Sequence, residues 1–402
     1  MTILLLILLI ILFRLAPQLI SSDILQTDDF VEYWAAGKLN LTGGNPYGPS
    51  ELLPLQLQIG RQYGVPVMMW NPPWTLALVM PFAYLDYPLA RFIWFLSHTA
   101  ILVFCARYLW RYCGGSHDKA WVAILITFTF LPSLFALKTG QISALLLLGL
   151  VFFLMWLERR TWWLLSLSLL LMAVKPHILY LPIVAFLWWS LRNDHWTLLL
   201  ISGMGILLAT GIAFIINPQV LVQYFYAIRN YPPDHFATPT LGGALRFVLG
   251  VDHIWLQFLP SFLGLLWFFL YWRKEGPTCR WSQQLPILTI ISALTASYAW
   301  SCDYLVFLLP ILSVATAIFR QGLNWVSISL IILYFAIDLQ VFRQVQQGNS
   351  NDFWFLWLAP ALSGWYFLAM RSGLAPGFDP QGANLQLENN FPHLTFPPRA
   401  SG

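Results

Sequence analysis

Apolar runs long enough to cross a bilayer recur along almost the whole chain. A membrane-spanning helix needs roughly 20 apolar residues, and the N-terminal MTILLLILLIILFRLAPQLI is the first such run. Only 9% of the 402 residues are charged, whereas soluble domains carry about 25%. The runs are continuous rather than alternating, unlike the strands of a β-barrel. The sequence therefore predicts an all-α polytopic integral membrane protein.

Counted separately, the runs give about twelve spans. They cover approximately residues 2–20, 88–111, 119–137, 141–157, 161–175, 177–191, 196–216, 255–272, 285–300, 303–319, 324–341 and 353–370. Segment 72–86 is short and is interfacial, re-entrant or a thirteenth span. The N-terminal run has no preceding basic region and no clear cleavage site after it, so we interpret it as an uncleaved helix.

Basic residues predict the orientation, because cytoplasmic loops are enriched in Lys and Arg. If 72–86 does not cross and the N-terminus is cytoplasmic, most basic helix ends fall inside. Two long loops, about 21–87 and 217–254, then lie outside, an arrangement typical of an active-site lid. Residues 1–370 form a single transmembrane domain, and the tail 371–402, with its Pro, Gly and Asn, is expected to be disordered and cytoplasmic.

Several classes of function are excluded by what the sequence lacks. The net charge of +4 forms no basic stripe, so nucleic acid is not an expected partner. The cysteines have no metal-ligand spacing, and we predict no metal-binding residues and no cofactor. Whether the reaction needs a metal ion stays open, since lysine and arginine alone could neutralise a lipid phosphate. No nucleotide-binding motif is present. An activated substrate would therefore come from the membrane.

The first outer loop, TDDFVEYWAAGKLNLTGGNPYGP, places two adjacent acids, Asp28 and Asp29, before a short helix. A carboxylate at the outer membrane surface can act as a general base for an attacking hydroxyl. Neighbouring side chains do not face the same way, so the two acids would not share one role. Alternatively, both are solvated loop acids, with Asp28 or Thr27 capping a helix that starts near Phe30.

Polar residues at the ends of later spans form a second set of candidates. Lys138 and Gln141 lie between two spans, and Lys175 and His177 lie between the next two. A lysine at such a depth needs a partner or a cavity, and a lipid phosphate would satisfy it. Alternatively, its side chain snorkels to the interface.

The second outer loop and the Trp300–Tyr304 stretch supply the remaining candidates. Arg246 could clamp a phosphate, or it could be an interfacial anchor. Asp303 is either a first-turn acid that complements the helix dipole or a residue of the cavity. The Trp70-Asn71-Pro72-Pro73-Trp74 motif has a structural role, because its prolines pre-set the start of a helix.

These signals occur in an order that resembles the polytopic glycosyltransferases of family 87. The stretches are DDFVEYWAAGKLNLTGGNPYGP, WNPPWTLALVMPFAYL, LKTGQISALLLLGLVFF, LLMAVKPHILYLPIVAFLWW, TLGGALRFVLG and AWSCDYLVFLLPIL. The resemblance covers about residues 28–320. It implies a GT-C-type fold and transfer of a hexose from a polyprenyl-phosphate donor to a lipid or glycan acceptor. Mannose is the first candidate for the hexose. The cavity would open on the outer face of the plasma or inner membrane.

The resemblance also implies roles for individual residues. Asp29 would be the base of an inverting displacement, with Asp28 in reserve, and Lys175 and Arg246 would bind the donor phosphate. Further cavity candidates are Tyr33, Gln141, His177, Arg229, His235 and Asp303. Family members often carry a histidine near Trp300, where this chain has Cys302 and Asp303. The alternatives to an enzyme are a transporter or flippase of lipid-linked sugars and a non-catalytic assembly partner.

Overall fold

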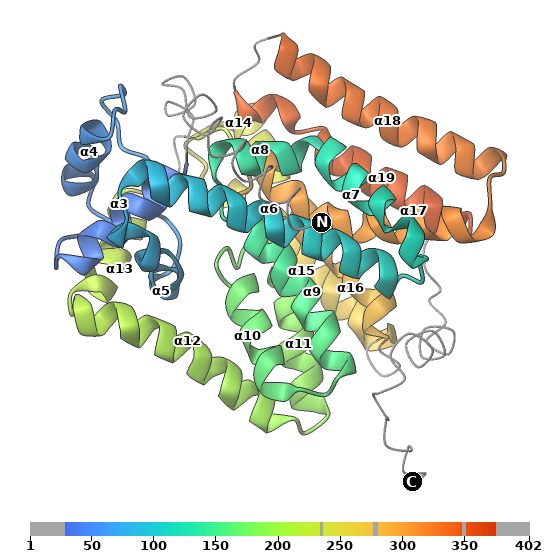
Figure 1. Ribbon diagram of the computed structural model, residues 1–402, viewed down its shortest axis with the longest axis horizontal. Helices are drawn as coiled ribbons and strands as arrows, with labels where there is room; N and C mark the ends of the chain where they lie inside the picture. Colours follow the sequence, from blue (N-terminus) through green and yellow to red (C-terminus); the bar gives the residue numbers. More distant parts are fainter. Residues whose placement is uncertain (1–28, 234–235, 276–279, 348–350, 375–402) are drawn as a thin grey trace, which may run out of the picture.

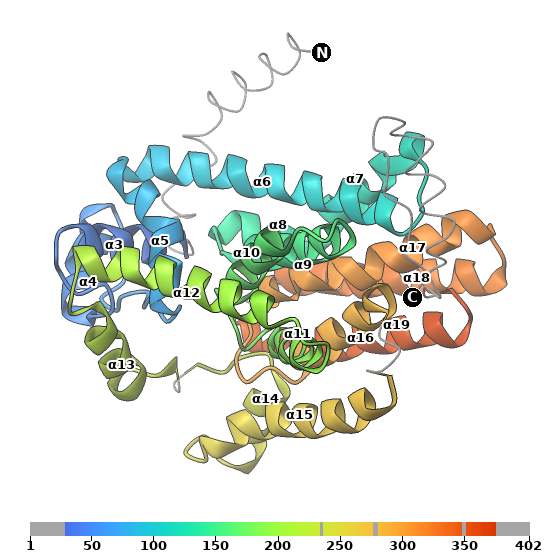
Figure 2. The same ribbon diagram turned by 90° about the horizontal axis from the view of Figure 1, so that it is seen from below.

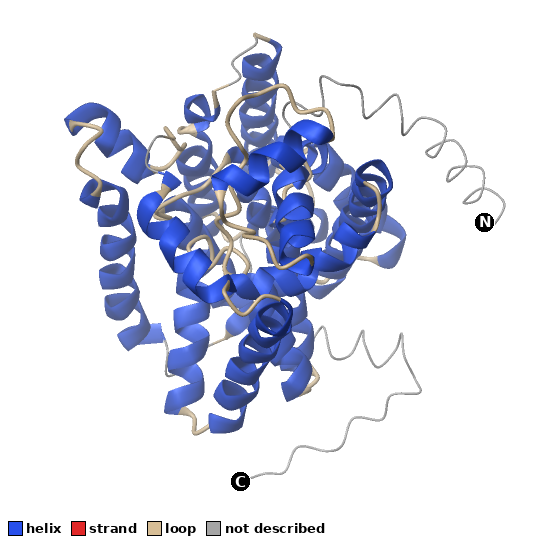
Figure 3. Cartoon of the chain, turned by 90° about the vertical axis from the view of Figure 1, so that its left-hand side faces the viewer, coloured by secondary structure: helices blue, strands red, loops and turns tan. Residues whose placement is uncertain are grey.

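The computed structural model describes residues 29–233, 236–275, 280–347 and 351–374 (Figure 1). Within these ranges the regular structure is helical and contains no strand, which confirms the predicted all-α class (Figure 3). Four expectations lie outside the described residues: the helix at 2–20, Asp28, His235 and the tail beyond Leu374. The first residues of the predicted tail, 371–374, are described, and Leu374 among them is buried.

The helices follow the apolar runs of the sequence. In chain order the α-helices are α3 (Phe30–Leu41), α4 (Pro49–Gln58), α5 (Leu76–Val79), α6 (Tyr87–Tyr112), α7 (Ala120–Thr129), α8 (Leu131–Thr139), α9 (Ser143–Glu158), α10 (Trp162–Met172), α11 (Tyr180–Arg192), α12 (Trp196–Ile216), α13 (Val220–Asn230), α14 (Leu241–Leu249), α15 (Trp255–Glu275), α16 (Trp281–Leu294), α17 (Leu308–Gln321), α18 (Trp325–Gln346) and α19 (Leu358–Arg371). Short 3-10 helices are η1 (Pro73–Thr75), η2 (Met80–Tyr84), η3 (His117–Lys119), η6 (Ser301–Phe307) and η7 (Asp352–Phe355).

Six helices of the described chain are long and apolar enough to cross a membrane, and a seventh is obtained if α7 and α8 form one bent span. The six are Tyr87–Tyr112, Trp196–Ile216, Trp255–Lys274, Ser301–Gln321, Trp325–Gln346 and Asp352–Arg371. A multi-pass membrane protein is therefore supported, but the predicted count of twelve or thirteen is not confirmed. Other predicted runs fold into shorter helices, such as α9 with 16 residues and α10 with 11.

Segment 72–86 folds into η1, α5 and η2 rather than a membrane-length helix. Its prolines interrupt helical hydrogen bonding, since proline has no backbone N–H to donate. The three turns pack against α3 and α12 instead. Figure 1 shows this region beside α3 and α4 at one end of the molecule.

A bend of 64° separates α7 from α8. Pro132 lies in the first turn of α8, where its missing N–H is tolerated. The backbone N–H of Leu131 donates to Asp338 Oδ1 on α18, with 3.2 Å between nitrogen and oxygen. An acid from another helix therefore satisfies one of the unpaired donors at the start of α8.

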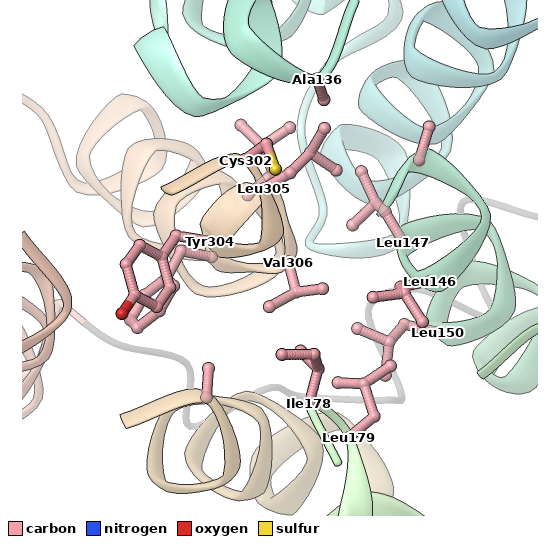
Figure 4. Packing of buried hydrophobic residues seen from close by; sticks show 14 of the residues in the cluster. Ala136, Leu146, Leu147, Leu150, Ile178, Leu179, Cys302, Tyr304, Leu305 and Val306 are labelled. Atoms are coloured by element: carbon pink, nitrogen blue, oxygen red, sulfur yellow. The ribbon is translucent and has the colours of Figure 1, made fainter. Parts of the chain in front are cut away.

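The segment formed by η6 and α17 is the most buried of the candidate spans. η6 contacts α8, α9 and α16. Figure 2 shows α6 along one side of the molecule and α15 along the opposite side, with α9, α16 and α17 between them. Figure 4 shows buried side chains of α8, α9, η6 and the α10–α11 turn packed together, including Leu147, Ile178 and Leu305. This apolar packing fixes the position of the polar residues on the same elements.

Replacing Asp338 by alanine should destabilise the protein by about 1 kcal/mol, the typical value of a helix N-terminal cap. The reason is the loss of the acceptor for Leu131 at the bend. Thermal unfolding in detergent measures the effect, with Asp118→Ala on the exposed turn η3 as the matched control. Equal unfolding temperatures for the two variants would contradict the capping role.

Candidate active site

Asp29 is the N-cap residue of α3, yet its carboxylate makes no capping hydrogen bond to that helix. Instead, Asp29 Oδ2 accepts a hydrogen bond from Gln141 Nε2, with 3.0 Å between the two atoms. The Asp29 backbone N–H also donates to the Thr139 carbonyl, with 2.6 Å between nitrogen and oxygen. The segment that begins at Asp29 is thus joined to the turn between α8 and α9, more than a hundred residues away. Asp29 itself is half-buried.

Gln141 is buried between three segments of the chain. Its Oε1 atom accepts from the Tyr33 hydroxyl at 2.8 Å and from Lys175 Nζ at 2.9 Å. Tyr33 belongs to α3, and Lys175 belongs to the turn between α10 and α11. The structure therefore brings together Asp29, Tyr33, Gln141 and Lys175, all of which were candidates from the sequence.

Lys175 forms a buried ion pair with Asp303 of η6, with Nζ 2.7 Å from Oδ1. Its side chain is 7% exposed and that of Asp303 is 0% exposed. Lys175 therefore does not snorkel to an interface. Asp303 also accepts from the Ser143 hydroxyl at 2.5 Å and from the Trp300 backbone N–H at 3.0 Å. Asp303 is thus a first-turn acid of η6 that also contacts the polar cluster, and its place in a substrate cavity stays a prediction.

Side chains of the Trp70–Trp74 motif hold the backbone that leads to Lys175. Asn71 and Trp74 donate to the carbonyls of Val174 and Ala173, at 2.8 and 2.9 Å, immediately before Lys175. The Trp70–Trp74 motif thus supports the Lys175 turn, a role that its sequence did not predict.

On α6, Arg91 donates to the carbonyls of Leu137 and Lys138, at 3.0 and 2.8 Å. Trp94 donates to the Gly140 carbonyl at 2.8 Å. Gly140 ends α8 with φ +73°, a conformation in which a side chain is disfavoured. Together these contacts fix the backbone that carries Gln141. Sequence reasoning missed Arg91, although an ionisable residue inside an apolar run is itself a signal.

Glu32 is a second buried carboxyl of the site that the sequence did not single out. It lies three residues after Asp29 on α3, a spacing that places both on one face of the helix. Burial, with a further contribution from the charge of Asp29, raises the pKa of Glu32 to about 8. Glu32 is therefore mostly protonated at neutral pH. The Lys175–Asp303 pair is neutral overall, so the cluster is not crowded with negative charge.

The remaining candidates lie in different surroundings. Arg246 is buried, and its guanidinium donates to the Val251 carbonyl and to Gln257 Oε1. His177 is half-buried, and its Nε2 atom makes no hydrogen bond within the described chain. Arg229 is exposed in the last turn of α13. Lys138 is exposed as well.

The described residues contain no group of three or more His, Cys, Asp and Glu side chains that could hold a metal ion. Cys105, Cys113 and Cys302 are free and buried. The expectation of a site without metal or cofactor stays a prediction. The positive groups available to an anionic substrate in this part of the chain are lysine and arginine side chains.

The fold and the site define an integral membrane protein with a carboxylate, a carboxamide and a lysine–aspartate pair in one buried polar cluster. The chain matches glycosyltransferase family 87 over residues 70–297, more than half of its length. It belongs to this family, which confirms the resemblance seen in its motifs. Gln141, Lys175 and Arg246 lie inside the matched range, and Asp29 and Asp303 lie outside it. Neither the comparison with curated proteins nor that with solved structures gave a match.

The stability of the protein should depend on pH through Glu32. The folded protein favours the protonated carboxyl, so this contribution to stability is full below the ordinary pKa of 4.5 and is lost as the pH rises towards about 8. Glu32→Gln removes that dependence. Wild type should therefore lose more stability than Glu32→Gln between pH 5 and pH 8, values chosen from roughly this window.

Thermal unfolding of both proteins in detergent at the two pH values measures the difference. Glu51→Gln, on exposed Glu51 of α4, is the matched control and should follow wild type. An identical pH dependence for wild type and Glu32→Gln would show that Glu32 is not held in its protonated form.

Proposed function

We propose that this protein transfers a hexose from a polyprenyl-phosphate donor to a lipid or glycan acceptor, with mannose as the first candidate for the hexose. Membership of glycosyltransferase family 87 supports glycosyl transfer in a membrane. A lipid-linked donor agrees with the apolar body of the protein and with the absence of nucleotide-binding motifs from its sequence. Family membership gives no support to the alternative of a transporter for lipid-linked sugars.

The observation that carries the proposed mechanism is the hydrogen bond from Gln141 to Asp29. This carboxylate faces the polar cluster rather than capping its own helix, and we propose that it acts as the general base. The acceptor hydroxyl oxygen attacks the anomeric carbon and its proton passes to Asp29. The bond between that carbon and the phosphate oxygen breaks, and the lipid phosphate leaves with the bonding electrons. A single displacement of this kind inverts the anomeric configuration. Asp28 is the reserve candidate for the base.

Lys175 and Arg246 are the proposed partners of the donor phosphate. An ammonium has three N–H donors, and Lys175 uses two of them for Gln141 and Asp303. A phosphate oxygen accepting the third would be stabilised as negative charge develops on the leaving group. Arg246 would act from the second loop, with its guanidinium turned from the Val251 carbonyl towards the phosphate.

The proposed location of this chemistry is the outer face of the plasma or inner membrane. Residues 21–71 contain five acids and only two basic residues, Lys38 and Arg61. Under the positive-inside rule such a segment favours the outer side. The basic helix ends at Arg159, Arg192 and Arg320 would then lie in the cytoplasm.

Asp29→Asn should lower sugar transfer by about 10²- to 10⁴-fold, the usual contribution of a general base. The side chain keeps its size, so the protein should still fold and insert. Transfer is measured with purified protein in detergent and a labelled polyprenyl-phosphate hexose, where turnover also excludes a pure transporter. Asp118→Asn on η3 is the control. Wild-type turnover by Asp29→Asn would refute the base assignment, and Asp28→Asn would be tested next.

Lys175→Ala should raise the donor KM by about tenfold or more, because a charged hydrogen bond to the phosphate is lost. Since Asp303 would be left buried without its partner, the double variant Lys175→Ala/Asp303→Ala provides a better-folded version of the test. Arg246→Lys, which keeps the charge but loses the planar fork, should raise the donor KM by a smaller factor.

Initial-rate kinetics over a range of donor concentrations measure these effects. Lys138→Ala is the control, because Lys138 is exposed at the end of α8. An unchanged donor KM in both the double variant and Arg246→Lys would rule out the phosphate-binding roles.

A further inference from the structure

The carboxamide of Gln141 has one chemically consistent orientation. Lys175 Nζ can only donate hydrogen bonds, so the amide atom 2.9 Å from it must be the oxygen. The Tyr33 hydroxyl donates to the same oxygen from 2.8 Å. The NH₂ group therefore faces Asp29 Oδ2, an acceptor, at 3.0 Å. Turning the amide over would place NH₂ against an ammonium and oxygen against a carboxylate, and would lose the bonds to Lys175 and Asp29, since only the Tyr33 hydroxyl can both donate and accept.

The donors that set this orientation are themselves fixed. Lys175 is held by buried Asp303, and leaving that partner would expose an uncompensated charge to the apolar interior. Tyr33 is fully buried and stacks on Trp94 of α6 with ring centroids 5.7 Å apart. The backbone of Gln141 follows the Gly140 turn that Trp94 also holds. Gln141 is thus oriented from one side and points its N–H at Asp29 on the other.

We infer that Gln141 is a positioning residue that directs the Asp29 carboxylate while separating it from the charge of Lys175. This inference rests on the proposed role of Asp29 as the base. A lysine in direct contact with a carboxylate favours the ionised form and makes it a weaker base. A neutral amide N–H holds the same oxygen in place with a smaller loss of basicity. Gln141 therefore links the cation and the base without pairing them.

This role makes different predictions for kcat and for the donor KM. Gln141→Leu removes the N–H and should lower kcat by about tenfold to a hundredfold, as expected for a hydrogen bond to a charged group. The donor KM should change by a smaller factor than kcat, because Lys175 keeps its partner Asp303 and Gln141 itself is not proposed to touch the donor.

Gln141→Glu is a second variant that keeps the fold of the site. Its carboxylate still accepts from Tyr33 and Lys175, but it places a negative charge beside Asp29 in place of the N–H. Two neighbouring carboxylates are harder to ionise together, so the acid limb of the kcat/KM profile should move up by roughly one pH unit or more. Part of the lost activity should return at higher pH. A purely structural role for Gln141 would not move this limb.

The experiment compares pH profiles of kcat and kcat/KM for wild type, both Gln141 variants and Asp29→Asn in detergent. Gln344→Leu on α18 is the matched control, since Gln344 also donates through its amide nitrogen and accepts through its amide oxygen, here with Trp354 and Trp357. If Gln141→Leu fails to fold, Gln141→Glu decides the test alone.

Each outcome has a distinct meaning. A lower kcat in Gln141→Leu together with the shifted limb in Gln141→Glu supports the inference. If Asp29→Asn is inactive but Gln141→Glu keeps the wild-type pH profile, the positioning role is wrong and the base assignment stands. If Asp29→Asn is active, the base assignment fails and the positioning role fails with it.

Discussion

The buried ion pair between Lys175 and Asp303 is the interaction on which the rest of the site depends. Removing one partner of such a pair costs about 3–5 kcal/mol, because the other charge stays buried without compensation. The α10–α11 turn must therefore lie against η6, and Figure 4 shows Ile178 of that turn beside Val306 of η6. Once Lys175 is fixed, it orients Gln141, and Gln141 reaches Asp29. A pair whose two charges must stay together thus also determines the geometry of the proposed base.

The sequence predicted the helices well where length and composition alone decide them. The runs at 88–111, 196–216 and 324–341 match α6, α12 and α18 to within a few residues. It did not predict that several other runs would fold into helices too short to meet the same length criterion. Apolar composition does not reveal depth, and the turn at Gly140 and the buried turn at Lys175 are fixed by contacts from α6 and from the Asn71 motif. Those contacts depend on tertiary packing rather than on local pattern.

Five residues of the polar cluster, Asp29, Tyr33, Gln141, Lys175 and Asp303, were candidates from the sequence, but their pairings were not predictable. Asp29 and Gln141 are 112 residues apart in the chain, and Lys175 and Asp303 are 128 apart. No local spacing links such positions, so the sequence left the partner of Lys175 open between a lipid phosphate and the interface. The protein supplies its own anion in Asp303. Glu32 is different, because its three-residue spacing from Asp29 was visible in the sequence.

The extent of the family match bears on how much of the chain forms one functional unit. Residues 70–297 contain Gln141 and Lys175 but neither Asp29 nor Asp303. Taken alone, the matched part would bury a lysine without its counter-ion and would present an amide N–H with no carboxylate to orient. From one side of that range Asp303 supplies the counter-ion of Lys175, and from the other side Asp29 supplies the acceptor of the Gln141 N–H. The contacts across its boundaries therefore show that the polar cluster forms only together with α3 and η6, which agrees with the predicted single transmembrane domain.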